Sequence, residues 1–170
     1  MQYKFENYPF WMIALANLMT ISIYALGIYI FAQWGIFFGV IYLFYCIWIE
    51  INLIRGSCVN CYYYGKYCSF GRGKICALLL IKGKPEKFID RKPTWKDILP
   101  DLMVLIFPAV AGIILLIRQY SWITLGAIVI IIFLSFMGNA FIRGSIACKH
   151  CKQQALGCPA AQLFSHSNSK

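Results

Sequence analysis

The most prominent pattern in this sequence is the alternation of long uncharged apolar stretches with shorter basic segments. No charged residue occurs within Asn7–Ile49, and a second uncharged stretch covers Gln119–Ile142. A membrane-spanning helix needs about 20 consecutive apolar residues, so the first stretch has room for two spans. We expect the break between them near Gln33, Trp34 and Gly35, where an amide, an interfacial aromatic ring and a helix-weakening glycine come together.

This pattern predicts an all-α integral membrane protein with four transmembrane helices. The expected spans are Pro9–Phe31, Gly35–Ile54, Leu99–Ile117 and Trp122–Ile142. We expect a kink at Pro108, because proline lacks the N–H that a helix interior uses. The segment Thr94–Asp97 follows Pro93 and has the pattern of a capping box, so helix is expected to begin there.

The composition agrees with a membrane protein and excludes several other classes. Apolar residues make up 61% of the chain and charged residues 13%, with a mean hydropathy of +0.67. A soluble domain carries about 25% charged residues, so a soluble enzyme, a secreted mini-protein and a disordered tail are excluded. The net charge of +10 lies where membrane proteins carry positive charge, and we expect no nucleic-acid partner.

The distribution of basic residues predicts the orientation in the membrane. Ten of the sixteen lysines and arginines lie in Arg55–Lys96, and four lie in the C-terminal tail beginning at Arg143. The two short turns between spans contain only Arg118. By the positive-inside rule we expect a multi-pass protein of the cell membrane with the N-terminus, the central segment and the C-terminus in the cytoplasm.

An internal repeat is the most specific signal in the chain. The tetrapeptide Ile-Arg-Gly-Ser occurs at Ile54–Ser57 and again at Ile142–Ser145. Each of its glycines, Gly56 and Gly144, is expected to end a helix in the left-handed conformation that glycine tolerates. Each tetrapeptide is followed by cysteines with the spacing C-x2-C-x6-C-x7-[C/H].

The sequence therefore predicts a duplicated unit, in which each repeat is a helical hairpin followed by a cytoplasmic, cysteine-rich, metal-binding loop. The first repeat covers residues 1–98 and the second covers residues 99–170. Clustered thiols in a reducing compartment favour metal ligation over disulfides or acylated thiols. The expected ligands are Cys58, Cys61, Cys68 and Cys76 in the first site, and Cys148, Cys151, Cys158 and His166 in the second. The alternative is that the two halves meet to form one shared site.

Two metals fit these ligand sets equally well. Zinc is bound in tetrahedral sites by four cysteines, or by three cysteines and one histidine. Iron–sulfur clusters take the same thiolates, although the C-x2-C-x2-C core of bacterial ferredoxins is absent. The cofactor is therefore expected to be an iron–sulfur cluster or zinc.

Several other residues allow more than one interpretation. Cys46 is expected to be a small core residue of the second span, and His150 a solvated neighbour of Cys151. Glu50 is expected to pair with Arg55 or reach the membrane surface, and less readily to carry a proton or a cation. The tyrosines of 62–67 either shield a metal centre from water or lie at the bilayer interface.

These observations lead to two functional hypotheses. In the first, the chain is an accessory or electron-transfer subunit of a membrane redox complex, in contact with other subunits and with an acidic carrier such as a ferredoxin. In the second, it is a zinc-stabilised scaffold or assembly protein without redox chemistry. The basic segment Arg72–Lys96 would bind anionic headgroups of the lipid bilayer or an acidic protein. No acid–base pair or activated nucleophile is visible, so we do not expect an enzyme.

Overall fold

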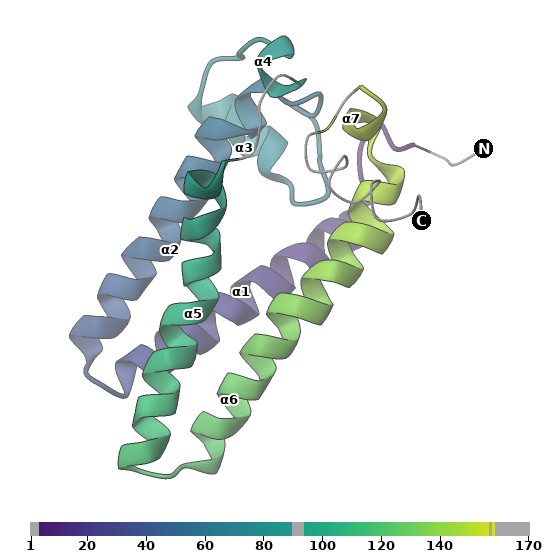
Figure 1. Cartoon of the computed structure of the whole chain (residues 1–170). Helices are drawn as coiled ribbons and strands as arrows, with labels where there is room; N and C mark the ends of the chain where they lie inside the picture. The colour runs from purple at the N-terminus through teal and green to yellow at the C-terminus, as the bar shows by residue number, and fades with distance from the viewer. Residues whose placement is uncertain (1–3, 90–93, 157, 159–170) are drawn as a thin grey trace. The chain divides into compact units, whose positions relative to one another are not determined.

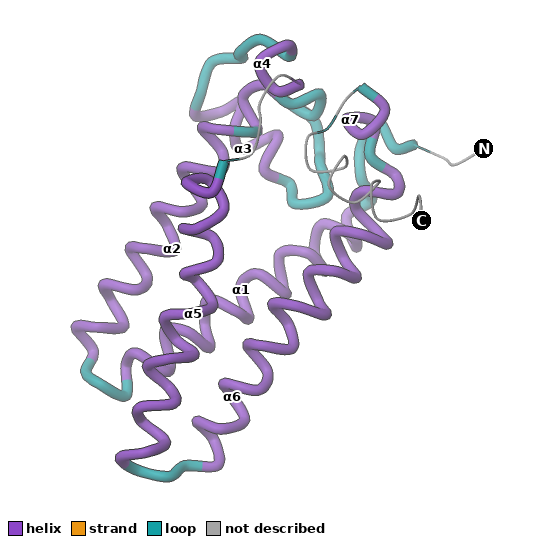
Figure 2. The backbone as a smooth tube through the Cα atoms, viewed as in Figure 1, coloured by secondary structure: helices purple, strands orange, loops and turns teal. Residues whose placement is uncertain are grey.

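The computed structural model describes residues 4–89, 94–156 and 158, and all regular elements within these ranges are helical (Figure 2). The long helices are α1 (Phe10–Ala32), α2 (Ile36–Gly56), α5 (Trp95–Arg118) and α6 (Trp122–Phe133). The helix α6 continues through two π-helical stretches, η2 (Leu134–Gly138) and η3 (Ala140–Ala147). The short elements are η1 (Cys58–Asn60), α3 (Arg72–Leu79), α4 (Glu86–Ile89), η4 (Cys148–His150) and α7 (Lys152–Ala155).

Four of these helical segments are long and apolar enough to cross a membrane. They are Phe10–Ala32, Ile36–Asn60, Ile98–Arg118 and Trp122–His150. The prediction of an all-helical chain with four candidate spans is therefore confirmed. The second and fourth segments extend past their expected ends, so that Cys58 and Cys148 belong to the ends of the helical segments themselves.

The predicted break in the first apolar stretch is also confirmed. Helix α1 ends at Ala32 and α2 begins at Ile36. Between them Gly35 has a φ of +149°, a conformation that side chains disfavour, so glycine is the residue suited to this turn. Helix α5 begins at Trp95, as the capping-box pattern predicts.

The predicted left-handed helix ends at Gly56 and Gly144 are wrong. Among the described residues the glycines with positive φ are Gly35, Gly65 and Gly71. Gly56 is the last residue of α2, and Gly144 lies inside η3. The chain continues from both into right-handed 3-10 turns, so neither position requires the reversal that a left-handed cap provides.

The chain forms two compact units, and each unit takes segments from both halves of the sequence. The first, which we call the loop unit, contains residues 1–16, 51–94 and 141–170; the second, the helix unit, contains residues 17–50 and 95–140. Within the helix unit, α5 and α6 run antiparallel and are joined by a short turn (Figure 1). Its core is a cluster of Ile30, Ala127 and Ile128.

A buried tyrosine satisfies the backbone at a proline in the helix unit. Pro108 lies inside α5 and has no N–H, so the carbonyl of Val104 lacks its helical donor. The Tyr42 hydroxyl donates a hydrogen bond to this carbonyl at 2.7 Å. The Tyr42 ring fits because residue 27 is glycine: a Cβ there would lie 2.5 Å from the ring.

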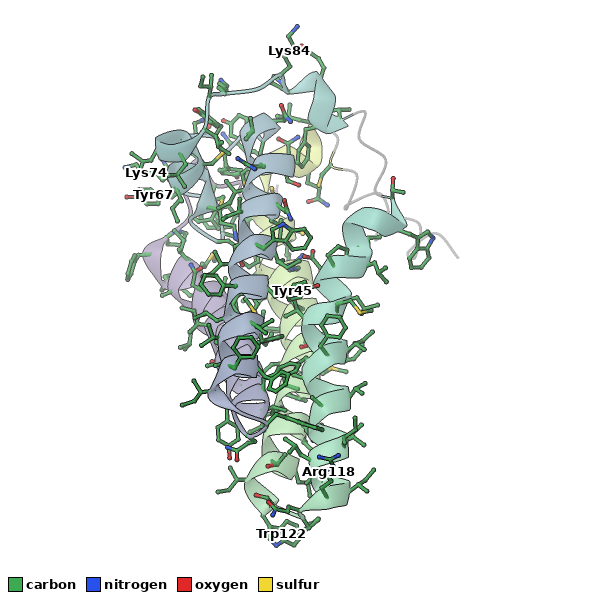
Figure 3. The ribbon with its side chains drawn as sticks, turned by 90° about the vertical axis from the view of Figure 1, so that its left-hand side faces the viewer. Tyr45, Tyr67, Lys74, Lys84, Arg118 and Trp122 are labelled. Carbon is green, nitrogen blue, oxygen red and sulfur yellow. The ribbon has the colours of Figure 1, made fainter. Side chains whose placement is uncertain are left out.

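The polar groups of α2 lie where neighbouring helices can satisfy them. The Tyr24 hydroxyl donates to Glu50 Oε1 at 2.8 Å. Cys46 is 2% exposed, which confirms its predicted place in the core. At the turn end of α5, shown by Arg118 and Trp122 in Figure 3, the Arg118 guanidinium lies 5.1 Å from the Trp34 ring centroid. The polar side chains Tyr24, Glu50 and Arg118 thus each have a partner within the helix unit.

Candidate thiol centre

The C-x2-C segments of the two halves have the same backbone conformation. Each forms a single 3-10 turn, η1 or η4, directly after a long helix. The N–H of Cys61 donates to the carbonyl of Cys58 at 3.3 Å, and the N–H of Cys151 donates to that of Cys148 at 3.1 Å. Both pairs therefore enter their loops with equivalent geometry.

The cysteine loops of the two halves meet in the loop unit. Cys61, Cys68 and Cys151 all pack against one buried cluster, which consists of Tyr8, Met12 and Tyr63. The Cys61 thiol lies within electrostatic range of three other thiols, those of Cys68, Cys151 and Cys158. Cys61 is thus the point at which thiols from both halves come together.

The remaining loop cysteines extend this set on either side. Cys58 lies within electrostatic range of Cys61, Cys68 and Cys76, and Cys148 lies within range of Cys151 and Cys158. All seven loop cysteines therefore belong to one connected group of thiols. His166, the eighth predicted ligand, lies outside the described residues.

The thiols are gathered without being arranged as a ligand set. In residues 4–89, 94–156 and 158, no three His, Cys, Asp or Glu side chains lie together in a way that could hold a metal ion. All eight cysteines of the chain are free thiols. The donor chemistry suits a thiolate-bound metal, and binding would require these sulfur atoms to approach one another.

Burial keeps three of these thiols, those of Cys61, Cys76 and Cys151, protonated and weakly reactive. It raises the pKa of Cys61 to about 11, and it also raises the pKa of Cys151 and of Cys76. Nucleophilic cysteines have a lowered pKa and an electropositive, accessible setting, whereas buried cysteines of raised pKa are inert. These three thiols therefore suit ligation or a structural role better than nucleophilic attack.

A tyrosine from the first loop covers the meeting point of the two loops. Tyr63 is 2% exposed and packs beside Cys61 and Cys151. Its hydroxyl donates to the carbonyl of Phe5 at 2.7 Å and accepts from the N–H of Lys152 at 3.1 Å. Tyr63 is therefore a core residue of the loop unit, and the shielding of a metal centre by the tyrosines stays a prediction.

The first loop folds tightly against α3. The N–H of Gly65 donates to the carbonyl of Gly73 at 2.9 Å. A Cβ on Gly73 would lie 2.1 Å from the carbonyl oxygen of Tyr63 and 2.5 Å from that of Lys66, so only glycine fits here. On the same helix face, Cys76 is fully buried.

The N-terminal segment binds the two loops together, a role that sequence reasoning missed. The N–H of Tyr8 donates to the carbonyl of Tyr67 in the first loop, and its hydroxyl donates to that of Ala147 in the second. The N–H of Phe5 donates to the carbonyl of His150 at 3.1 Å. The His150 ring lies 5.1 Å from the Phe5 ring, so His150 is half-buried and not the solvated neighbour that we expected.

Glu6 adds an ionic link between the same two loops. Its carboxylate accepts hydrogen bonds from Lys66 at 2.9 Å, from the Tyr62 hydroxyl at 2.8 Å, and from Lys152. Hydrogen bonds from Lys152 first, then Lys66 and Tyr62, lower the pKa of Glu6 to about 2. The sequence signal for this role was available, because Glu6 is the only acidic residue ahead of the first apolar stretch.

Two arginines supply positive charge beside the thiols. The Arg72 and Arg143 guanidinium groups lie 5.0 and 5.5 Å from the ring centroid of Phe70, one from each half of the chain. Arg72 lies within electrostatic range of Cys58, and Arg143 within range of Cys148. Such charges favour the anionic thiolate form that a metal requires.

Comparison with known proteins gives no family to which this arrangement can be assigned. No family model matches the chain, and neither a curated protein nor a solved structure resembles it significantly.

Proposed function

We propose that this chain is a small membrane metalloprotein in which the two cysteine loops jointly bind a thiolate-ligated metal centre. The observation that carries the proposal is the packing of cysteines from both halves, Cys61 and Cys68 from the first and Cys151 from the second, against one buried cluster. A thiolate centre needs deprotonated sulfur ligands brought together from short loops, and each C-x2-C turn presents two.

The equivalent 3-10 turns support the interpretation of the chain as two repeated hairpins with cysteine-rich loops. In this reading, η1 and η4 are the same structural element in two copies, each following the second helix of a hairpin. The ligands of the proposed centre are Cys61, Cys68, Cys151 and Cys158, the four thiols that meet around Cys61. This shared centre replaces the two separate sites that the spacing alone suggests. Cys58, Cys76 and Cys148 would lie at the edges of the shared centre.

The function that we propose for this centre is electron transfer as a subunit of a membrane redox complex, with the centre an iron–sulfur cluster. A cluster in thiolate ligation carries negative charge, and Arg72 and Arg143 lie beside the thiols to balance it. Burial beneath Tyr63 would limit the access of water to the cluster. The solvent exposure of such a cluster is one of the factors that set its reduction potential. The proposal includes the cytoplasmic location predicted from the basic residues, where thiols remain reduced.

A second candidate is a zinc-stabilised scaffold. The observation that favours it is the sparse regular structure of the loop unit outside the long helices. This part of the unit consists of short elements such as η1 and the four-residue α7, packed near a small buried cluster of Tyr8, Met12 and Tyr63. Loops of this kind obtain little stability from packing and gain it from a structural metal. This function would need no redox chemistry and no electron-transfer partner.

The deciding experiment is metal analysis with an absorption spectrum of anaerobically purified protein. Iron and acid-labile sulfide, with visible absorption that bleaches on reduction, would support electron transfer. A colourless protein with bound zinc would discard electron transfer and leave the scaffold. A protein with neither metal would overturn both candidates.

Cysteine variants test whether the centre is shared. Cys61→Ser and Cys151→Ser are each expected to remove all bound metal, because each takes a ligand from the same centre. Cys46→Ala is the matched control, since this cysteine lies in α2 and belongs to the helix unit. Retention of half the metal in both loop variants would show two separate sites and contradict the shared centre.

A further inference from the structure

The helix α3 has two faces of different character, and one of them has no explanation in the thiol centre. Gly73 and Cys76 are buried against the first cysteine loop. The other face exposes large aliphatic side chains: Ile75 is 47% exposed, Leu78 84% and Leu79 69%, and Ile81 just beyond the helix is 91% exposed. Isolated exposed aliphatic side chains are ordinary, but four of them within seven residues form a patch.

The charged residues within the segment that carries this apolar patch all have one sign. Arg72, Lys74, Lys82 and Lys84 lie within residues 72–84, and no acidic residue occurs there. Lys74, labelled in Figure 3 beside Tyr67, has its ammonium 4.6 Å from the Tyr67 ring centroid. An exposed apolar patch with a basic border is typical of segments that lie in the interface of an anionic membrane.

The position of this segment in the chain brings it to a membrane surface. It lies in the connection between two candidate spans, Ile36–Asn60 and Ile98–Arg118, so both ends of the connection are tied to the same side of the bilayer. Such tethering gives the segment a high effective concentration at the headgroups. An acidic protein could match the basic charge, but it would not be held beside the segment in this way.

We propose that residues 72–84 form an interfacial membrane anchor, in which Leu78, Leu79 and Ile81 enter the headgroup boundary of anionic lipids and the flanking lysines bind the phosphates. The buried face of α3 carries Cys76 and holds the cysteine loop through Gly73. The anchor would therefore fix the thiol centre next to the bilayer surface. This proposal does not depend on which metal, if any, the thiols bind.

The test is amide hydrogen exchange of the full chain in nanodiscs, measured by mass spectrometry over residues 72–84. We expect exchange in discs containing phosphatidylglycerol to be at least about tenfold slower than in pure phosphatidylcholine discs, since each basic residue near an anionic surface contributes about a fivefold preference. Lys74→Gln and Lys82→Gln should each lower the ratio of the two exchange rates about fivefold. Exchange in α6 should be the same in both discs.

A triple variant separates insertion from simple charge attraction. Replacing Leu78, Leu79 and Ile81 by serine should abolish most of the protection in anionic discs, whereas Leu156→Ser is the matched control because Leu156 is 53% exposed in the same unit. All of these positions are exposed, so the variants should fold, with unchanged exchange at Tyr63 as the check. Equal exchange in the two disc types would overturn the proposal. Protection that requires other proteins of the native membrane would overturn it in favour of a protein partner.

Discussion

The two units of this molecule satisfy their polar groups in opposite ways. In the helix unit, backbone groups form hydrogen bonds within long helices. The Val104 carbonyl, which lacks a helical donor because of Pro108, accepts a hydrogen bond from the Tyr42 hydroxyl. In the loop unit, segments far apart in the chain are joined by hydrogen bonds that the Tyr8 and Tyr63 hydroxyls donate and that the Glu6 carboxylate accepts. The stability of the helix unit should therefore depend on packing, and that of the loop unit on specific polar contacts and, under the proposed function, on the metal that its thiols would bind.

The largest expected difference between the units is their response to metal removal. If the thiols hold a metal, chelation should lower the local stability of the loop unit by at least about 3 kcal/mol, because metal ligation supplies folding free energy to loops with a small core. Amide hydrogen exchange before and after chelation measures this directly. Exchange of α5 and α6 in the helix unit should change by less than about twofold. Equal acceleration in both units would contradict the distinction that we draw.

The next largest effect is expected from Gly73→Ala. Its Cβ would collide with the backbone carbonyls of Tyr63 and Lys66, which cannot move aside as a side chain can. We expect the free energy of unfolding of the loop unit to fall by about 3 kcal/mol, which is at the upper end of the range for overpacked cores. The measurement is the rate at which a thiol reagent modifies Cys61. Gly144→Ala is the control, because a Cβ at that position meets no atom within 4 Å, and equal rates in the two variants would contradict the assignment.

A smaller effect is expected in the helix unit from Tyr42→Phe. Removal of the hydroxyl leaves the Val104 carbonyl unsatisfied, at a cost of about 1 kcal/mol in the free energy of unfolding. In the Pro108→Ala background an N–H is restored at position 108, so the same substitution should cost less. A double-mutant cycle in mixed micelles measures the coupling. Additive effects would show that Tyr42 does not act through this carbonyl.

The smallest effect is a pH dependence of the loop unit. The pKa of Glu6 is lowered to about 2 by its hydrogen bonds to Lys152, Lys66 and Tyr62. A carboxylate of lowered pKa stabilises the folded state above its ordinary pKa of 4.5, and this stabilisation is lost as the pH falls toward 2. The denaturant midpoint of the loop unit should therefore fall as the pH decreases over this range, and the fall should be smaller in Glu6→Gln. Glu86→Gln, exposed in the same unit, should behave as the unsubstituted protein.

The sequence predicted those features that depend on local patterns. The four apolar helices, the turn at Gly35, the start of α5 at Trp95 and the burial of Cys46 all follow from composition and spacing within one segment. The meeting of the two cysteine loops was left open, because it depends on contacts between residues far apart in the chain. The contact of Tyr8 with Ala147, separated by 139 positions, has no local signature.

The wrong prediction at Gly56 and Gly144 has a related cause. A glycine after a helix is often a left-handed cap, and that preference was the only local signal available. The 3-10 turns that follow, and the cysteine contacts that those turns make, determine the backbone there instead. Long-range packing overrode a valid local preference.

The division of the loop unit among three distant segments has a consequence for biosynthesis. A ribosome releases residues 1–16 before residues 51–94, and residues 141–170 after both. The first four cysteines of the loop unit must therefore wait on the nascent chain until residues 141–158 have been synthesised. The loop unit can therefore complete its fold only after all four candidate spans have been synthesised, and a chain terminated before residue 141 would expose these thiols to cellular quality control.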